Sequence, residues 1–362
     1  MNHITIVAGA RPNFMKIAPI IHEIKKKRAE GIDIDYSLVH TGQHYDKKMS
    51  GNFFEQLNIP EPDANLSAGG GTQAEQTGAI MIRFEEYLMK NPTDLVLVVG
   101  DVTSTMACAI CAQKLHTRVA HVEAGIRSND WSMPEEINRL VTDAITDYFF
   151  TTSRSANSNL IASGYSDDQI FFVGNCMIDT LVANRPRFIE PLIWKERGLI
   201  EKKYFMMTLH RPANVDEASK LKELMNEIII NTKDMPLVFP VHPRTKKMLN
   251  ELGVEHERLH MVDPMSYLEF NYLVEKSFAV VTDSGGITEE TTVMGVPCLT
   301  LRDNTERPET ITMGTNELIG TDPMNIAPAM KTLFNGDWKK GSLPELWDGK
   351  TAGRIVQKLI EL

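Results

Sequence analysis

Short runs of apolar residues alternate with segments of helical periodicity along the chain, and this alternation constrains the fold more than any other feature. Parallel strands need a crossover connection, usually a helix, so this order predicts parallel sheets covered by helices. The strands predicted in the first half are residues 4–8, 36–40, 95–99, 119–122, 148–151 and 170–173. Those predicted in the second half are residues 205–209, 237–241, 259–262, 279–282 and 297–301.

The two sets of strands predict two doubly wound α/β domains. A chain of 362 residues is too long for one ordinary hydrophobic core. Residues 184–203 have the mixed polar, proline-containing composition of a connector. Residues 353–362 form an amphipathic pattern, which predicts a helix that returns to the first half. We therefore expect one domain over residues 1–173 plus 350–362, and a second over residues 174–349.

Charge and hydropathy exclude several classes of function. The formal net charge is -10 at pH 7, whereas a nucleic-acid surface usually carries a basic stripe. No apolar run is long enough to span a membrane, and residues 4–12 lack the flanks of a signal peptide. We therefore expect a cytoplasmic protein without nucleic-acid or membrane partners. Any phosphate group that it binds must meet a local cluster of donors.

Four cysteines in a chain of this length do not form a disulfide framework. Cys108 and Cys111 make a C-x-x-C pair, but they lie in a predicted helix over residues 105–115. No second Cys or His pair follows at zinc-finger spacing. We predict that these two thiols pack in the core, and we expect no metal site.

Polar side chains directly follow seven of the predicted strands. In open α/β sheets, ligands bind beyond the carboxyl ends of the strands. These positions therefore predict a ligand-binding cleft between the two domains. They are Arg11, Gln43 with His44, Asp101, Glu123, His210 with Arg211, His242, and Asp283.

Two of the loops after strands are similar to each other. Both lead from a strand through an Arg-Pro step, Arg11-Pro12 and Arg211-Pro212, into a predicted helix. Proline in the first turn of a helix costs no hydrogen bond, so it fixes the arginine at the edge of the sheet. The alternative is that both arginines are ordinary solvated surface charges.

The segment 282–290 is the best candidate for a phosphate site. A predicted strand runs into Ser284-Gly285-Gly286 and then opens a helix, whose free N–H groups and dipole favour an anion. Glu290, one turn into the helix, is placed to accept hydrogen bonds from ribose hydroxyls. The alternative is a capped helix with a glycine-rich turn. Further positive charge is available from Lys16, Arg302 and Arg307.

Carboxylates gather where extra negative charge is unexpected in an anion-binding protein. Glu123 directly follows a predicted buried strand, and Glu135 and Glu136 come shortly after it. A carboxylate at such a position is costly unless it is paired or used in chemistry. The first strand-to-helix loop, residues 9–14, lacks the G-x-G-x-x-G dinucleotide fingerprint, and no Walker A sequence occurs. We therefore expect neither a nicotinamide cofactor nor an ATP-driven reaction.

Eight motifs together resemble the non-hydrolysing UDP-N-acetylglucosamine 2-epimerases, and the match is collinear from residue 4 to residue 320. The resemblance implies a GT-B fold, in which two Rossmann-like domains face a central nucleotide-sugar cleft, and a homodimer. It also implies interconversion of UDP-N-acetylglucosamine and UDP-N-acetylmannosamine without an added cofactor. The motifs are G-A-R-P-x-F-x-K (9–16), T-G-Q-H (41–44), G-D-V-x-S-T (100–105), H-V-E-A-G-I-R (121–127), M-P-E-E-I-N-R (133–139), L-H-R-P (209–212), D-S-G-G-I-x-E-E (283–290) and R-D-x-T-E-R-P-E (302–309).

The resemblance also implies roles for individual residues. The positions implicated in catalysis are Asp101, Glu123, Glu135 and His210, and the sequence leaves open which carboxylate is base and which is acid. Glu290 falls on the ribose contact and Phe270 beside the uracil. Lys16 and Arg139 lie in the catalytic motifs as further substrate-binding candidates. The diphosphate-contacting positions are Arg11, Ser284, Gly285, Gly286 and Arg307.

The chain departs from family members that carry an additional, activating substrate site. Gln43, Glu135, Arg211 and His242 match the lining of that site. Asp46 replaces a second Gln, residues 67–73 lack an Arg, and Pro212 replaces another Arg, so we expect no such activation. The same changes resemble relatives that act on other UDP-2-acetamido sugars, including 2,3-diacetamido uronic acids. A GT-B glycosyltransferase and a non-catalytic UDP-sugar-binding protein are the remaining alternatives.

Overall fold

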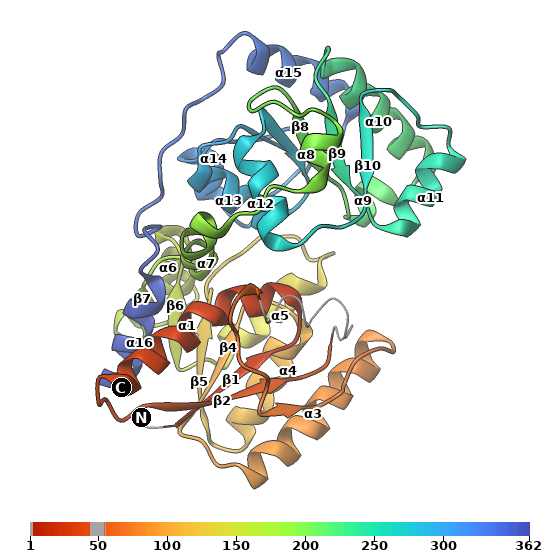
Figure 1. Ribbon diagram of the computed structural model, residues 1–362. Coiled ribbons are helices and arrows are strands. Elements are labelled where there is room, and N and C mark those ends of the chain that lie inside the picture. The colour runs from red at the N-terminus through yellow and green to blue at the C-terminus, as the bar shows by residue number, and fades with distance from the viewer. Residues whose placement is uncertain (1–2, 44–53, 55) are drawn as a thin grey trace. The chain divides into compact units, whose positions relative to one another are not determined.

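The computed structural model describes residues 3–43, 54 and 56–362, and it divides the chain into two compact units (Figure 1). Unit 1 comprises Met1–Ala183 and Glu345–Leu362, and unit 2 comprises Asn184–Pro344. The predicted connector therefore begins at the boundary. It forms the 3-10 turn η2 (Arg185–Arg187) and the short helix α8 (Leu192–Glu196) of unit 2.

Unit 1 contains a seven-stranded parallel sheet in the order β3-β2-β1-β4-β5-β6-β7. All six predicted strands are present, and their ends agree with the prediction to within one residue. The sequence missed β3, which has only two residues and therefore carries no readable alternation. The strands are β1 (His3–Ala8), β2 (Asp35–His40), β3 (Ala64–Asn65), β4 (Leu95–Val99), β5 (Arg118–Val122), β6 (Tyr148–Thr151) and β7 (Ile170–Phe172).

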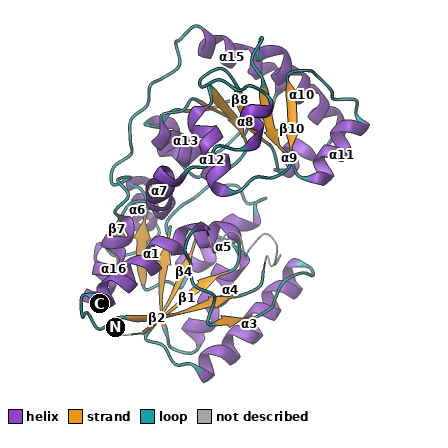
Figure 2. Cartoon of the chain, viewed as in Figure 1, coloured by secondary structure: helices purple, strands orange, loops and turns teal. Residues whose placement is uncertain are grey.

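Helices enclose this sheet, and the last helix of the chain is one of them (Figure 2). Asp179 accepts hydrogen bonds from the backbone N–H groups of Thr351 and Ala352, at 3.0 and 2.7 Å. Because the first N–H groups of a helix have no partner within the helix, this carboxylate fixes its start. The helices are α1 (Arg11–Ala29), α3 (Gln73–Lys90), α4 (Thr103–Lys114), α5 (Pro134–Ala144), α6 (Arg154–Ala162), the 3-10 turn η1 (Asp167–Gln169), α7 (Cys176–Asn184) and α16 (Thr351–Glu361).

The C-x-x-C pair lies on α4, inside the core of unit 1. Cys108 and Cys111 are free, and both belong to a buried cluster with Val96 and Val98 of β4. Burial raises the pKa of both thiols, that of Cys111 to about 11. The predicted packing role is therefore confirmed.

Unit 2 contains a six-stranded parallel sheet in the order β10-β9-β8-β11-β12-β13. The five predicted strands are present, and the three-residue β13 was missed. The strands are β8 (Phe205–Thr208), β9 (Leu237–Pro240), β10 (Leu259–Val262), β11 (Ala279–Thr282), β12 (Cys298–Thr300) and β13 (Asn316–Leu318). The helices are α9 (Pro212–Val215), α10 (Ala218–Asn231), α11 (Pro243–Glu251), α12 (Tyr267–Lys276), α13 (Gly285–Met294), α14 (Pro308–Thr312), the 3-10 turn η3 (Pro323–Asn325) and α15 (Ile326–Phe334).

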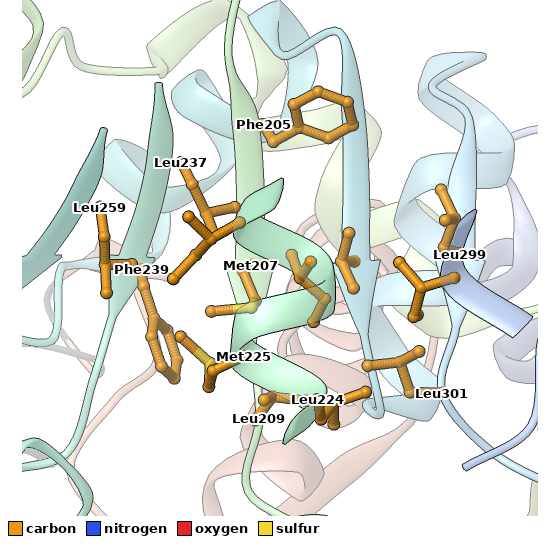
Figure 3. Packing of buried hydrophobic residues seen from close by; sticks show 14 of the residues in the cluster. Phe205, Met207, Leu209, Leu224, Met225, Leu237, Phe239, Leu259, Leu299 and Leu301 are labelled. Atoms are coloured by element: carbon orange, nitrogen blue, oxygen red, sulfur yellow. The ribbon is translucent and has the colours of Figure 1, made fainter. Parts of the chain in front are cut away.

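The main core of unit 2 forms between its sheet and helices α10 and α15. Figure 3 shows side chains of this cluster, among them Met207 of β8, Phe239 of β9 and Met225 of α10. These three side chains are fully buried. Strands buried on both faces give continuous apolar runs rather than alternation, and these runs made the strands predictable.

The strand order reverses at one place in each sheet. The reversal lies between β1 and β4 in unit 1, and between β8 and β11 in unit 2. Open α/β sheets bind ligands at such switch points, beyond the carboxyl ends of the strands. The expected fold of two Rossmann-like domains is confirmed. Within the described part of the chain, no helix combines the length and apolarity needed to cross a membrane.

Candidate active site

The loop between β1 and α1 is held by one buried amide. Asn13 Oδ1 accepts hydrogen bonds from the backbone N–H groups of Gly9 and Ala10, both at 3.0 Å. Its Nδ2 donates to the carbonyl of Val99, the last residue of β4, at 3.0 Å. This network places Arg11 at the first position of α1, where partial burial lowers the pKa of its guanidinium.

Glu123 directly follows β5 and is almost completely buried, with 3% exposure. Its Oε2 lies 2.7 Å from Nζ of Lys16, which comes from α1 and is also buried. Glu123 has a φ of +72°, in the left-handed region that non-glycine residues rarely adopt. The sequence considered Lys16 as additional charge for a phosphate, and the structure brings it to a catalytic candidate of its own unit.

Asp101 lies just beyond β4, and its carboxylate is held by Arg139 of α5. The Nη1–Oδ2 distance is 2.5 Å, and one third of the Asp101 side chain is exposed. Arg139 also binds Glu136 at 2.6 Å. Burial opposes ionisation of Glu136, but hydrogen bonds from Ser128 and Arg139 outweigh it and lower the pKa of Glu136. The buried arginine therefore pairs with the buried carboxylate of Glu136 and with that of Asp101, which is partly open to solvent.

Gly100 lies close to both ion pairs, because it packs against Lys16 and directly precedes Asp101. A Cβ atom at Gly100 would come within 2.9 Å of Lys16 Nζ, so the lysine that binds Glu123 packs against the residue preceding Asp101. Gly100 also has a φ of +67°. Asp101 and Glu123, each with its own cation, thus lie at the ends of the adjacent strands β4 and β5 of unit 1.

Glu135 and Glu136 are neighbours in sequence but lie in different environments. Glu136 is buried against Arg139, whereas Glu135 is exposed in the first turn of α5. A carboxylate in the first turn is favoured by the helix dipole. Glu135, the predicted catalytic candidate, is therefore open to solvent, whereas Glu136 has a structural role as the buried partner of Arg139.

In unit 2, Asp283 organises the loop after β8. Its carboxylate accepts hydrogen bonds from the backbone N–H groups of His210 and Arg211 and from the side chain of Asn214. His210 Nδ1 lies 2.8 Å from Asp283 Oδ1, and 60% of the imidazole is exposed. Burial opposes ionisation of Asp283, but these contacts outweigh it and lower its pKa. Sequence reasoning placed Asp283 at a strand end but missed that it orients His210.

The candidate phosphate loop begins α13, as the sequence predicts. Ser284 occupies the position before the helix, and its N–H donates to Thr282 Oγ1 at 3.0 Å. A Cβ atom at Gly285 would come within 2.8 Å of Glu306 Oε1, so a larger residue there would require the Glu306 carboxylate to shift. Gly286 follows in the first turn.

Two arginine–glutamate pairs whose arginines are buried lie near α13. Arg302 binds Glu306 at 2.5 Å, and Arg307 binds Glu289 of α13 at 2.6 Å. Burial opposes ionisation of Glu306, but Arg302 outweighs it and lowers the pKa of Glu306 to about 2. These glutamates balance the arginine charge in the interior.

Glu290 lies one turn into α13 and is buried. Its Oε1 accepts hydrogen bonds from Tyr267 Oη at 2.9 Å and from Asn271 Nδ2 at 3.4 Å. Burial raises the pKa of Glu290 to about 7. Phe270 lies on the same helix, α12, as its two partners and is half-buried. His242 follows β9 and is exposed.

The structure thus distributes the predicted site residues between the two units. His44, which follows a predicted strand, and Asp46, where the chain departs from the activated family members, lie outside the described residues. Among residues 3–43, 54 and 56–362, no three His, Cys, Asp or Glu side chains gather as metal ligands would. Unit 1 carries Arg11, Lys16, Asp101, Glu123, Glu135 and Arg139, and unit 2 carries His210, His242, Phe270, Ser284, Gly285, Gly286, Glu290 and Arg307.

The fold and these side chains define a GT-B-type protein, with paired carboxylates in one doubly wound domain and a helix N-terminus near buried arginines in the other. The model of the UDP-N-acetylglucosamine 2-epimerase family matches residues 25–360. The chain belongs to this family, whose members are isomerases.

Two curated relatives have equal sequence identity to this chain. The UDP-N-acetylglucosamine 2-epimerase of Methanocaldococcus jannaschii is 40% identical over 368 residues, covering 98% of each chain. A UDP-2,3-diacetamido-2,3-dideoxy-D-glucuronate 2-epimerase of Pseudomonas aeruginosa is 40% identical over 369 residues, covering 100% of each. A crystal structure of the M. jannaschii enzyme with UDP-GlcNAc and UDP superposes with a TM-score of 0.89 at 38% identity, covering 99% of this chain and 100% of the other.

Proposed function

We propose that this enzyme inverts C2 of a UDP-2-acetamido sugar, interconverting UDP-N-acetylglucosamine and UDP-N-acetylmannosamine. The observation that carries the proposal is the pair of neighbouring strand ends in unit 1, where Asp101 and Glu123 follow adjacent strands and each is paired with a buried cation. A protein that only bound a UDP-sugar would have no use for such costly carboxylates.

The substrate itself limits the reaction. C2 bears an acetamido group and has no adjacent carbonyl, so its proton is not acidic. We propose that the C1–O bond to UDP breaks with oxocarbenium character while a base removes the C2 proton. The products of this elimination are UDP and 2-acetamidoglucal. UDP then adds back to C1 while an acid delivers a proton to the opposite face of C2, which gives the epimer.

Unit 1 supplies the groups for this proton transfer. Asp101, Glu123 and Glu135 share the roles of base, acid and stabiliser of the positive charge that develops on the ring. Lys16 and Arg139 pair with Glu123 and Asp101, respectively, and orient these carboxylates. Proton transfer to both faces of C2 requires more than one such group, and the ends of β4 and β5 offer two carboxylates that are each paired with a cation.

Unit 2 binds UDP in this proposal. The N–H groups at the start of α13, from Ser284 to Gly286, and Arg307 neutralise the diphosphate, with Arg11 of unit 1 contributing further charge. Glu290 accepts hydrogen bonds from the ribose, and Phe270 lies beside the uracil. His210, oriented by Asp283, and His242 contribute to binding of the substrate. His210 also assists departure of UDP.

One experiment tests the reaction and identifies the sugar. The wild-type protein is incubated in deuterated water with UDP-N-acetylglucosamine or with a UDP-2,3-diacetamido uronic acid, and C2 is followed by NMR. The proposal predicts deuterium at C2 together with the manno isomer of UDP-N-acetylglucosamine. Faster exchange of the uronic acid would assign the enzyme to the alternative substrate, which the P. aeruginosa relative supports. No exchange with either sugar would contradict the proposal.

The same experiment separates the competing functions. A GT-B glycosyltransferase would transfer the sugar only with an acceptor, and a binding protein would leave C2 unlabelled. Free N-acetylmannosamine and UDP would indicate a hydrolysing enzyme. We also propose a cytoplasmic homodimer, as the family resemblance implies. Light scattering of the purified protein tests the dimer.

A further inference from the structure

We infer that His121 is a positioning residue that ties together the two turns carrying Asp101 and Glu123. The inference rests on the proposed function, because it takes from there the catalytic role of these two carboxylates. His121 lies in β5, two residues before Glu123, and its side chain is fully buried. Its Nε2 lies 2.8 Å from the carbonyl oxygen of Gly100, the residue that precedes Asp101. Nε2 of His121, on β5, thus holds the backbone at the end of β4.

The other ring nitrogen holds the turn after Glu123 through a carboxylate. His121 Nδ1 lies 2.7 Å from Asp143 Oδ1. Asp143 Oδ2 accepts hydrogen bonds from the backbone N–H of Gly125 at 3.1 Å and from Arg127 Nη1 at 2.6 Å. Burial opposes ionisation of Asp143, but His121 and Arg127 outweigh it and lower the pKa of Asp143, which keeps the carboxylate an acceptor.

Asp143 extends the connection to the helix that holds Asp101. It lies on α5, which also carries Arg139 and Glu136. The His121–Asp143 pair therefore joins β4, β5, the turn after β5 and α5. These are the elements that place Asp101, Glu123 and the guanidinium between Asp101 and Glu136.

The turn after β5 needs such a restraint. Glu123 has a φ of +72°, and a backbone of this kind persists only where surrounding contacts hold it. Both nitrogens of His121 face acceptors, a carboxylate and a carbonyl. Each ring nitrogen of a histidine can act as a hydrogen-bond donor to the acceptor that it faces. An amide side chain can replace only one of these donors: glutamine reaches the position of Nε2, and leucine replaces neither.

Three variants test the inference against simple loss of packing. His121→Leu removes both donors, and His121→Gln keeps a donor for the Gly100 carbonyl. Val119→Ala is the control, because Val119 is buried on the same strand but packs in the core cluster of the sheet, away from both carboxylates. Each variant is assayed for kcat, KM and UDP affinity at a temperature at which its circular dichroism shows a folded protein.

The inference predicts a loss in kcat with binding preserved. Misplacement of a reacting group by 1 Å can cost about 100-fold in rate, so we expect a decrease of that order in His121→Leu. UDP affinity should stay within about two-fold of wild type, because the proposed function assigns UDP binding mainly to unit 2 and the lost contacts lie within unit 1. His121→Gln should recover part of the lost rate, and Val119→Ala should keep the wild-type kcat. Wild-type kcat in His121→Leu, or an equal loss in Val119→Ala, would overturn the inference.

A second measurement does not depend on activity. In His121→Leu, amide hydrogen exchange should accelerate in residues 100–102 and 123–127, and it should be unchanged there in Val119→Ala. Unchanged exchange in His121→Leu would overturn the inference even if the enzyme is an epimerase. If the wild type turns over no UDP-2-acetamido sugar, the proposed function fails, and the exchange data still decide whether His121 joins the two turns.

Discussion

Lys16 Nζ lies 2.7 Å from Glu123 Oε2, and the two side chains are only 9% and 2% exposed. The pair joins α1 to the end of β5 across 107 residues of sequence. Burying either charge alone would be costly, and burying both is tolerated because each neutralises the other. The Glu123 carboxylate, which the proposed mechanism uses for proton transfer, is thereby held in place by a buried cation of its own unit.

Replacing Lys16 with Met should destabilise the protein. The substitution leaves the Glu123 carboxylate buried without its cation, which typically costs about 3–5 kcal/mol. The free energy of unfolding in urea measures the effect. In the double variant Lys16→Met with Glu123→Gln most of the stability should return, since neither charge remains. Equal stability of wild type and the single variant would show that the pair carries no such energy.

The backbone at Glu123 makes a separate prediction about stability. With φ at +72°, the position favours a residue without a Cβ atom. Glu123→Gly should therefore be more stable than Glu123→Ala by about 1 kcal/mol, although both lack the carboxylate and both should be inactive. Thermal unfolding of the two variants provides the comparison. Greater stability of the alanine variant would mean that the left-handed turn is not required.

Glu290 predicts a pH dependence of stability. Burial raises its pKa from 4.5 to about 7, so the folded protein retains this proton when the unfolded chain has lost it. Stability should therefore fall as the pH rises from 4.5 to 7, by up to about 3 kcal/mol from this group. Glu290→Gln removes the titrating group. The free energy of unfolding of this variant, relative to that of the wild type, should therefore increase between pH 5 and pH 8. If the stability of the two proteins changed in parallel with pH, Glu290 would not have the raised pKa on which this prediction depends.

Gly285→Ala should weaken UDP binding. The added Cβ would lie 2.8 Å from Glu306 Oε1, so the Arg302–Glu306 pair or the start of α13 must shift. Because binding at a helix N-terminus depends on close approach to its N–H groups, we expect about a ten-fold loss of UDP affinity by calorimetry. Gly353→Ala on α16 is the matched control, since a Cβ there meets no atom within 4 Å. Equal affinity of both variants would argue against a tight fit at Gly285.

The sequence predicted the strands well because strands covered on both faces are rich in apolar residues, as in β4, which is apolar and buried throughout. It missed β3 and β13, whose two and three residues carry no pattern. It also predicted which loops carry polar groups, since in a parallel sheet the carboxyl ends of the strands lie at one edge.

The sequence could not predict how charges pair. Lys16 is far from Glu123 along the chain, so its partner depends on how α1 packs on the sheet. Glu135 and Glu136 look equivalent in sequence, but the direction of each side chain on α5 leaves one exposed and buries the other. The role of Asp283 in orienting His210 likewise depends on adjacent strands that lie 73 residues apart in the chain.

The most direct test of the account is C2 exchange in deuterated water by Asp101→Asn and Glu123→Gln, each with its UDP affinity measured in parallel. General acid–base groups typically contribute at least about 100-fold in rate. Both variants should therefore lose C2 deuteration and epimer formation by at least that factor, while UDP binds with near wild-type affinity. Near-normal exchange in either variant would show that its carboxylate does not transfer the C2 proton or stabilise the transition state.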